Sequence, residues 1–163
     1  MLKPALLVTA ILVLTSLSVQ ANDKKHHDNS AVSISNAYIR VLPGAQKNTA
    51  AFVHIHNASD RAINLQSLNS TWAETVDLHQ STMEQGMIKM RPLDTLSIPA
   101  GSTVEFHPGQ DHIMFSGLKK KLQVGDTVDL KLCFGYFCQQ IDLLAVSVLD
   151  DVSAKKSHTH HHD

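Results

Sequence analysis

Turn-forming residues divide the middle of this chain into short apolar segments, and this interruption limits its fold more than any other feature. The segments show period-2 alternation or short apolar runs, and none has a sustained helical stripe. The alternation is clearest over residues 127–132, where Val128, Leu130 and Leu132 are expected to face the core. The pattern predicts an all-β domain, built as a two-sheet sandwich or a Greek-key barrel.

The expected strands are separated by turns rich in Pro, Gly, Asn and Asp. These residues favour turns because of their restricted or left-handed backbone angles and their short hydrogen-bonding side chains. The expected strands are residues 32–35, 37–41, 50–56, 62–67, 73–80, 87–92, 103–106, 112–115, 127–133 and 139–148.

The N-terminus has the three parts of a secretory signal. Lys3 supplies the positive charge, an apolar run extends from Ala5 to Leu17, and Val19-Gln20-Ala21 provides the small residues of a cleavage site. The apolar run is shorter than the roughly 20 residues that a membrane-spanning helix needs. Residues 1–21 are therefore expected to be removed after Ala21, which leaves an exported protein without stable membrane insertion.

Two polar segments flank the region with strand patterning. Residues 22–30 and 150–163 have too few apolar side chains to bury, so they are expected to be flexible tails. The folded domain is expected to span residues 31–149, a length suited to one hydrophobic core. The whole chain has 14 basic and 15 acidic side chains. This balance gives no electrostatic reason to expect nucleic acid as a partner.

Histidine and methionine are prominent in the composition, with 11 and 5 residues. The segment Glu84-Gln85-Gly86 is expected to be a hairpin turn that sets His79 and Met90 nearly opposite each other on two strands. His112 and Met114 are separated by one residue, so their side chains are expected to leave the same face of one strand, about 7 Å apart at Cα. The strand pattern therefore allows the four side chains to meet.

Two imidazoles and two thioethers form a soft, neutral donor set. Thioether sulfur favours Cu(I) over hard ions such as Ca²⁺ and Mg²⁺. It is also a weaker ligand for zinc than a thiolate or a carboxylate. Methionine also cannot be lost to a disulfide in an oxidising compartment. The donor set therefore predicts a site for monovalent copper. Met83 and Met87 flank the same turn, either as an access path for the ion or as the apolar rim of the site.

The four residues also have a long and specific spacing. Ten residues separate His79 from Met90, twenty-one separate Met90 from His112, and one separates His112 from Met114. The spacing resembles the full metal-binding motif of the periplasmic copper chaperones of the PCu(A)C family. The segments LHQSTMEQGMIKMRPL, IPAGSTVEFHPGQDHIMFSGL and GDTVDLKL are also similar to that family, so the resemblance covers most of the domain.

This resemblance implies a cupredoxin-like Greek-key β-sandwich that binds Cu(I) through His79, Met90, His112 and Met114. It also implies a periplasmic, non-enzymatic carrier that delivers copper to a cytochrome c oxidase subunit or to a Sco-like assembly factor. Copper storage or detoxification is an alternative, because it differs from delivery only in the fate of the bound ion. A blue-copper electron carrier is disfavoured, because it needs a cysteine thiolate that the motif lacks.

Cys133 and Cys138 flank four residues, Phe134 to Phe137, and are expected to meet across a hairpin loop. In an exported chain, a structural disulfide is the leading expectation. Its loop is short, so its entropic contribution to stability is expected to be modest. A thiol redox role is a further alternative, although the pair is not arranged as Cys-x-x-Cys.

The remaining histidines are weaker signals of metal binding. His54 and His56 share a face of one strand, but no third ligand is evident nearby in the sequence, so no site is expected there. His107 precedes Pro108 at a turn and indicates nothing further. Imidazole suits Cu(II), and an accessory copper site is therefore expected in the C-terminal tail, at His158, His160, His161 and His162.

Overall fold

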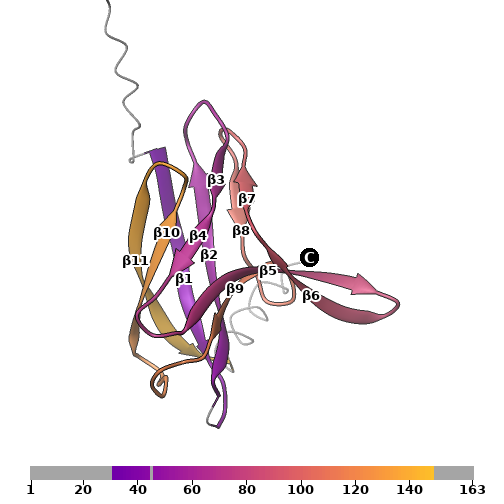
Figure 1. The fold of residues 1–163 in the computed structure, drawn as a ribbon, viewed down its shortest axis with the longest axis vertical. Coiled ribbons are helices and arrows are strands. Elements are labelled where there is room, and N and C mark those ends of the chain that lie inside the picture. The colour runs from indigo at the N-terminus through magenta and orange to yellow at the C-terminus, as the bar shows by residue number, and fades with distance from the viewer. Residues whose placement is uncertain (1–30, 45, 149–163) are drawn as a thin grey trace, which may run out of the picture.

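The structure is a computed structural model that describes residues 31–44 and 46–148, and strands dominate this region (Figure 1). The expected signal at residues 1–21, both expected tails, and the four C-terminal histidines lie outside the described residues. The strands are β1 (Val32–Val41), β2 (Asn48–Asn57), β3 (Ile63–Leu65), β4 (Ser67–Asn69), β5 (Thr75–Glu84), β6 (Met87–Leu93), β7 (Leu96–Ile98), β8 (Thr103–Glu105), β9 (His112–Ser116), β10 (Thr127–Cys133) and β11 (Cys138–Ser147).

One large sheet organises the domain. Its strands have the order β4-β10-β11-β1-β2-β9-β5-β6, and β8 also pairs with β2. Strands β3 and β7 form a separate two-stranded sheet. Strands β1 and β11 run parallel, whereas β1–β2, β10–β11 and β5–β9 are antiparallel. The all-β architecture expected from the sequence is confirmed.

Several strand boundaries differ from the expected ones for local reasons. Strand β1 continues through Asn36, where a break was expected, because a bulge with a positive φ of 50° absorbs the irregularity. The single strand expected at residues 62–67 is divided at Gln66, whose N–H donates to the carbonyl of Cys133. Strand β7 was not expected, because its three residues give too short a pattern to recognise.

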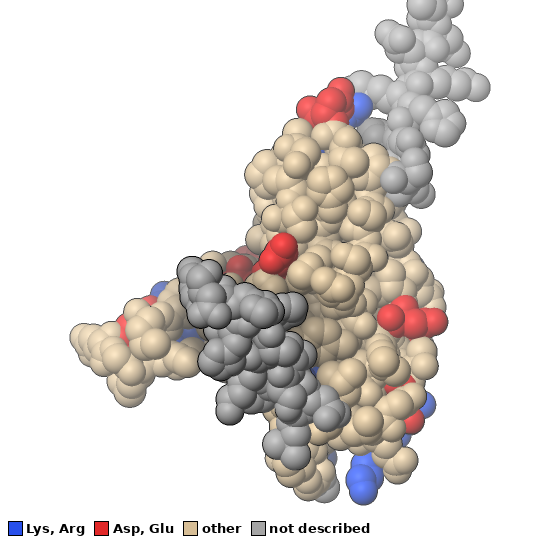
Figure 2. All heavy atoms as spheres, turned by 180° about the vertical axis from the view of Figure 1, so that it is seen from behind, with Lys and Arg blue, Asp and Glu red and all other residues tan. Residues whose placement is uncertain are grey.

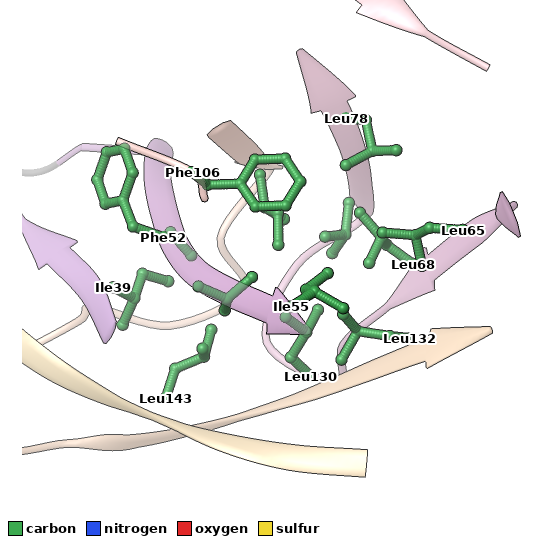
Figure 3. Close-up of a cluster of buried hydrophobic side chains, with 14 of the residues drawn as sticks. Ile39, Phe52, Ile55, Leu65, Leu68, Leu78, Phe106, Leu130, Leu132 and Leu143 are labelled. Atoms are coloured by element: carbon green, nitrogen blue, oxygen red, sulfur yellow. The ribbon is translucent and has the colours of Figure 1, made fainter. Parts of the chain in front are cut away.

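The hydrophobic core lies between the faces of the curled sheet (Figure 3). The alternation in β10 is confirmed, since Val128, Leu130 and Leu132 are fully buried. Ile39 of β1 and Ile55 of β2 are buried in the same cluster. Burial of such side chains supplies the main favourable free energy of folding.

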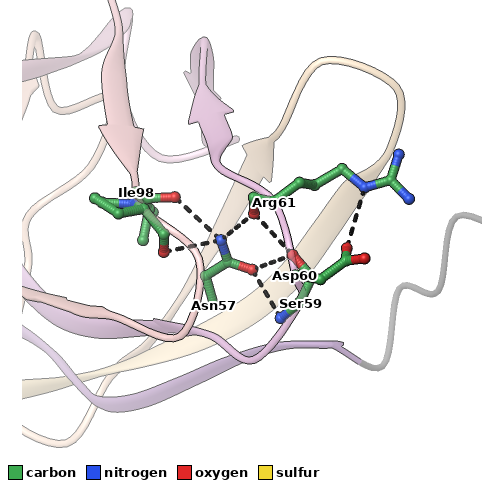
Figure 4. Close-up of polar contacts among 6 residues, drawn as sticks. Asn57, Ser59, Asp60, Arg61 and Ile98 are labelled. Atoms are coloured by element: carbon green, nitrogen blue, oxygen red, sulfur yellow. Dashed lines mark hydrogen bonds and ion pairs between the residues drawn. The ribbon is translucent and has the colours of Figure 1, made fainter.

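A buried amide fixes the end of β2 (Figure 4). The Nδ2 of Asn57 donates to the carbonyls of Arg61 at 2.8 Å, Ile98 at 3.0 Å and Pro99 at 3.1 Å. Its Oδ1 accepts from the N–H and the hydroxyl of Ser59. Both ends of this fully buried amide are therefore satisfied, and they tie β2 to the β3–β7 pair.

The hairpin formed by β5 and β6 extends away from the body of the domain (Figures 1 and 2). The first half of β5, from Thr75 to His79, pairs with β9, whereas the second half pairs with β6 only. Lys89 and Arg91 form ion pairs with Glu84 at 2.9 Å and 2.6 Å on the hairpin. The hairpin therefore begins in the packed sheet and ends in solvent.

Candidate metal centre

The antiparallel pairing of β5 and β9 brings His79 and His112 together. The two residues are direct partners in the ladder. Side chains of directly opposite residues leave the same face of a sheet. The imidazole rings are stacked, with centroids 5.9 Å apart and an interplanar angle of 19°. Two residues from distant parts of the sequence thus form the centre of the site.

His112 is held in an orientation suited to metal binding. Its side chain is buried, with 5% exposure. Its Nδ1 lies 3.0 Å from the carbonyl oxygen of Gln110. A carbonyl oxygen can only accept, so Nδ1 carries the proton in this bond and the lone pair of the neutral ring lies on Nε2. This is the arrangement by which outer groups fix the tautomer of a metal-binding histidine.

His79 contributes a ring nitrogen that the described part of the protein leaves without a partner. Its Nδ1 is buried and makes no hydrogen bond with any residue in the ranges 31–44 and 46–148. Leaving a buried polar atom unsatisfied costs roughly 1–3 kcal/mol. A metal ion bound at this nitrogen would remove that cost, so the residues present fit a metal ion at this position.

Met114 lies on the same face as the two histidines. It pairs with Asp77 of β5 and with Ala50 of β2. It lies two residues after His112 on β9. Its side chain is half-buried. His112 and Met114 therefore share one face of one strand, as the sequence predicts.

Met90 occupies a different register from the expected one. It pairs with Ser81, and His79 pairs with Pro92, so the prediction that His79 and Met90 lie nearly opposite each other is wrong by two residues. The turn consists of Gln85 and Gly86, with φ angles of 52° and 79°, and lies one residue later in the chain than predicted. Positive φ at both positions is typical of a type I′ hairpin turn.

The shifted register still keeps Met90 on the face that carries the histidines. Ser81 and His79 are two residues apart and point to the same side of β5. Met90 is 59% exposed, because it lies on the part of the hairpin that extends beyond β9. The structure thus places His79, His112 and Met114 in adjacent positions and Met90 farther out on a diagonal.

An apolar strip continues from Met90 to the hairpin tip. Met83 pairs with Ile88, and both lie on the same face as Met90. Met83 is 68% exposed and Ile88 is 56% exposed. Met87 pairs with Glu84 and therefore lies on the opposite face. The pairing thus separates two methionines that the sequence alone could not distinguish.

The two cysteines are remote from this site in the sheet order. Cys133 and Cys138 are partners at the end of the β10–β11 hairpin, and a disulfide joins them. Strand β10 lies next to β4 at one end of the sheet path, whereas β5 and β6 lie at the other end. The disulfide therefore belongs to the body of the domain.

A second group of ligand-type side chains was missed by the sequence analysis. Glu105 of β8 is the ladder partner of His54, and His107 comes two residues later. The pKa of Glu105 is lowered, first by its hydrogen bond with His107 and then by the positive charge that His54 can carry. The spacing Glu-x-His at residues 105–107 was a signal, but only the β2–β8 pairing connects it to His54.

Comparisons with known proteins place these features in a family. A family model described as "Putative lipoprotein LpqE-like" matches residues 32–136. The chain is 31% identical over 104 residues to "Putative lipoprotein Lxx21020" of Leifsonia xyli subsp. xyli, covering 63% of this chain and 61% of that protein. It is 28% identical over 101 residues to "Uncharacterized protein RP573" of Rickettsia prowazekii, covering 61% and 56%. The chain thus spans less than two thirds of the length of either relative.

Solved structures show a similar fold. The apo form of DR1885 from Deinococcus radiodurans is 25% identical, with a TM-score of 0.58 over 91% of this chain and 99% of that one. The CuI form of DR1885 is 27% identical, with a TM-score of 0.55 over 78% and 84%. The copper-bound PCuAC domain of PmoF2 is 19% identical, with a TM-score of 0.62 over 72% and 93%. These likenesses confirm the expected cupredoxin-like β-sandwich and the resemblance to PCu(A)C chaperones.

No helix in residues 31–44 and 46–148 is both long and apolar enough to span a membrane. The "lipoprotein" descriptions of the family and of one relative are consistent with an exported protein.

Proposed function

The chain belongs to the LpqE-like family and has the fold of PCuAC copper-chaperone domains, and from this premise we propose that it carries one Cu(I) ion on His79, Met90, His112 and Met114. The observation that carries the proposal is the facing pair of His79 and His112. The buried Nδ1 of His79 has no hydrogen-bond partner among the described residues, and the Nδ1 of His112 donates to the carbonyl of Gln110. Both imidazoles can therefore direct a lone pair toward one ion.

The donor set selects the oxidation state of the cargo. Neutral imidazole and thioether ligands match the soft Cu(I) ion, and they add no negative charge that would favour Ca²⁺ or Mg²⁺. Burial of His112 and partial burial of His79 and Met114 shield this part of the site from water. The rigid ladder of β5 and β9 positions three ligands before the ion arrives, which lowers the entropic cost of binding.

The exposed ligand provides the means of release. Met90 lies on the projecting hairpin and is reachable from solvent. A ligand of an acceptor protein can replace its thioether while the two histidines still hold the ion. Copper can thus pass between proteins by ligand exchange, and we infer that the acceptor is a cytochrome c oxidase subunit or a Sco-like assembly factor. The carrier needs no catalytic group for this exchange.

We also infer the cellular setting from the ends of the chain. Cleavage after Ala21 would release the protein into the periplasm, with the copper-binding domain at residues 31–149 between two polar segments. The histidines at 158, 160, 161 and 162 would serve as an accessory Cu(II) site in the C-terminal tail. Copper storage or detoxification would use the same core site without transfer to an acceptor.

Cu(I) titration of the purified protein against a competing chelator tests the core site. The wild-type protein is expected to bind one Cu(I) tightly under reducing conditions. Replacing Met114 with Leu keeps the side-chain volume and removes the sulfur, so Cu(I) affinity is expected to fall by at least about tenfold. Met87→Leu is the matched control, because Met87 lies on the other face of the sheet. Equal affinity in the Met114 variant and the control would refute the assignment.

A transfer assay distinguishes delivery from storage. The Cu(I)-loaded protein is mixed with an apo Sco-like protein or the soluble copper domain of an oxidase, and the two are separated by ion exchange. Delivery predicts that copper elutes with the acceptor. Copper that stays with the donor over hours would favour storage. Normal Cu(I) binding in a variant with Ser at both positions 133 and 138 would exclude a role for the two cysteines in the site.

A further inference from the structure

A second group of metal-ligating side chains lies outside the His and Met site. His54 of β2 and Glu105 of β8 are direct partners in an antiparallel ladder, so their side chains share one face. His107 lies two residues beyond Glu105, after β8 ends. The ligand atoms of the three side chains all lie within 4.8 Å of one another.

The distances within this group suit a shared ion. Nε2 of His107 lies 2.9 Å from Oε2 of Glu105, and Nδ1 of His54 lies 4.0 Å from Oε1 of the same carboxylate. Metal–ligand bonds of about 2.0–2.2 Å bring neighbouring ligand atoms to roughly 3–3.5 Å. A small rotation of the partly exposed His54 and Glu105 side chains therefore closes the remaining gap. The two imidazole rings meet edge to face, with centroids 5.3 Å apart.

Asn36 prepares His54 for this role. The bulge in β1 gives Asn36 a left-handed conformation and brings its Nδ2 within 3.0 Å of Nδ1 of His54. An amide nitrogen can only donate, so Nδ1 of His54 holds the lone pair and Nε2 holds the proton. The nitrogen that faces Glu105 is therefore the basic one, and an arriving ion can displace this exposed hydrogen bond.

The composition of the group differs from that of the His and Met site. Two imidazoles and one carboxylate are borderline and hard donors, and no sulfur is among them. Such a set suits a divalent transition-metal ion, and Cu(II) binds nitrogen and oxygen ligands more tightly than the other divalent ions of its row. Side-chain exposures of 24%, 49% and 43% for His54, Glu105 and His107 leave room for water to complete the coordination.

We propose that His54, Glu105 and His107 form a second metal site, which binds Cu(II). The loop of residues 107–111 connects it to the His and Met site. This loop is closed by hydrogen bonds from the N–H of His107 to the carbonyl of Asp111 and from the N–H of Gln110 to the carbonyl of His107. The carbonyl of Gln110 accepts from Nδ1 of His112. One short, ordered loop thus begins at a ligand of the second site and is followed directly by His112, a ligand of the first.

Electron paramagnetic resonance of bound Cu(II) tests the proposal in the full exported chain. The tail histidines at 26, 27, 158, 160, 161 and 162 are first replaced with Asn, so that they bind no Cu(II). One equivalent of Ag(I), which gives no signal, is added to fill the His and Met site. Cu(II) is then titrated, and one Cu(II) per chain with nitrogen hyperfine structure is expected.

Variants of two of the three ligands decide the outcome. His107→Ala and Glu105→Gln are expected to weaken Cu(II) binding by about tenfold or more, because loss of a ligand costs at least as much as loss of an outer-sphere partner. His56→Ala is the matched control. His56 lies on the same face of β2 as His54, but its Nδ1 forms a hydrogen bond with the hydroxyl of Thr103 rather than facing Glu105. Circular dichroism confirms that each variant folds.

Two results would contradict the proposal of a second metal site. One is the same Cu(II) affinity and spectrum in His107→Ala and Glu105→Gln as in the parent protein. The other is an equal loss in His56→Ala, which would indicate nonspecific binding along the strand. The readout does not depend on Cu(I), so a failed core assignment and a failed second site give different results.

Discussion

The body of the domain and the β5–β6 hairpin are both built from strands, but they differ in how many of their side chains are buried. In the body, β10 buries every second residue, including Leu130 and Leu132. In the hairpin, six of the seven residues of β6 are exposed. The proposed copper site lies where the two regions meet, with His79 and His112 on the body side and Met90 on the hairpin side. Folding stability and exchange of the ion can therefore change independently.

Leu132→Ala tests the body side and is expected to have the largest effect on stability. The side chain is fully buried in β10, and its loss should lower the free energy of unfolding by about 2–5 kcal/mol. Urea denaturation measures the change. Cu(I) affinity of the folded variant is expected to match wild type, because Leu132 points into the core, whereas His79 and His112 lie on the face of β5 and β9 that is opposite the buried Leu78 and Ile113. A parallel loss of Cu(I) affinity would show that the two regions are coupled.

Replacing both Cys133 and Cys138 with Ser removes the disulfide at the end of the β10–β11 hairpin. The loop that it closes is short, so the expected loss of stability is roughly 2 kcal/mol. Thermal unfolding of the wild-type protein with and without a reductant provides the control. Cu(I) binding is expected to stay unchanged, and a marked loss would instead favour a copper or redox role for the thiols.

Met90→Leu tests the hairpin side and is expected to lower Cu(I) affinity while leaving stability almost unchanged. Surface substitutions usually change stability by less than about 0.5 kcal/mol, and Met90 is exposed. Cu(I) affinity is nevertheless expected to fall by about tenfold or more, because a proposed ligand is lost. Paired urea and chelator-competition measurements on Met90→Leu and Met87→Leu separate the two effects. Unchanged affinity in Met90→Leu would leave a three-ligand site on β5 and β9.

The pH dependence of stability is expected to show the smallest effect. The pKa of Glu105 is lowered by its hydrogen bond with His107 and by the positive charge that His54 carries when it is protonated. A lowered folded-state pKa stabilises the protein above the ordinary glutamate pKa, and this contribution is lost as pH falls through the lowered value. Urea midpoints of wild type and Glu105→Gln should therefore differ slightly at neutral pH and converge in acid. A difference that grows in acid would contradict this sign.

The sequence predicted most of the fold because its signals are local. Residues 127–133 alternate clearly, and β10 has those bounds. The resemblance to PCu(A)C proteins named four ligands, of which His79, His112 and Met114 lie in adjacent ladder positions. Strand alternation alone indicates that His112 and Met114 share a face, because the two residues lie on one strand. The face of Met90 relative to His79 depends in addition on the length of the turn between their strands.

The remaining features depend on contacts that the sequence does not display. The hairpin register depends on Gln85 adopting a positive φ, which is uncommon for a residue with a long side chain. The group around His54 depends on the pairing of β2 with β8, which joins residues about fifty positions apart. Such pairings are decided by the packing of the whole sheet, so neither segment alone indicates its partner.

The two-residue turn at Gln85 and Gly86 also limits how this protein can change over evolution. Inserting or deleting a single residue between His79 and the turn would send every later side chain of the hairpin to the other side, and Met90 would point away from its partners. Length changes in steps of two would preserve the side but move the sulfur along the strand. Natural variants and engineered grafts of this hairpin should therefore tolerate even-numbered length changes better than odd ones.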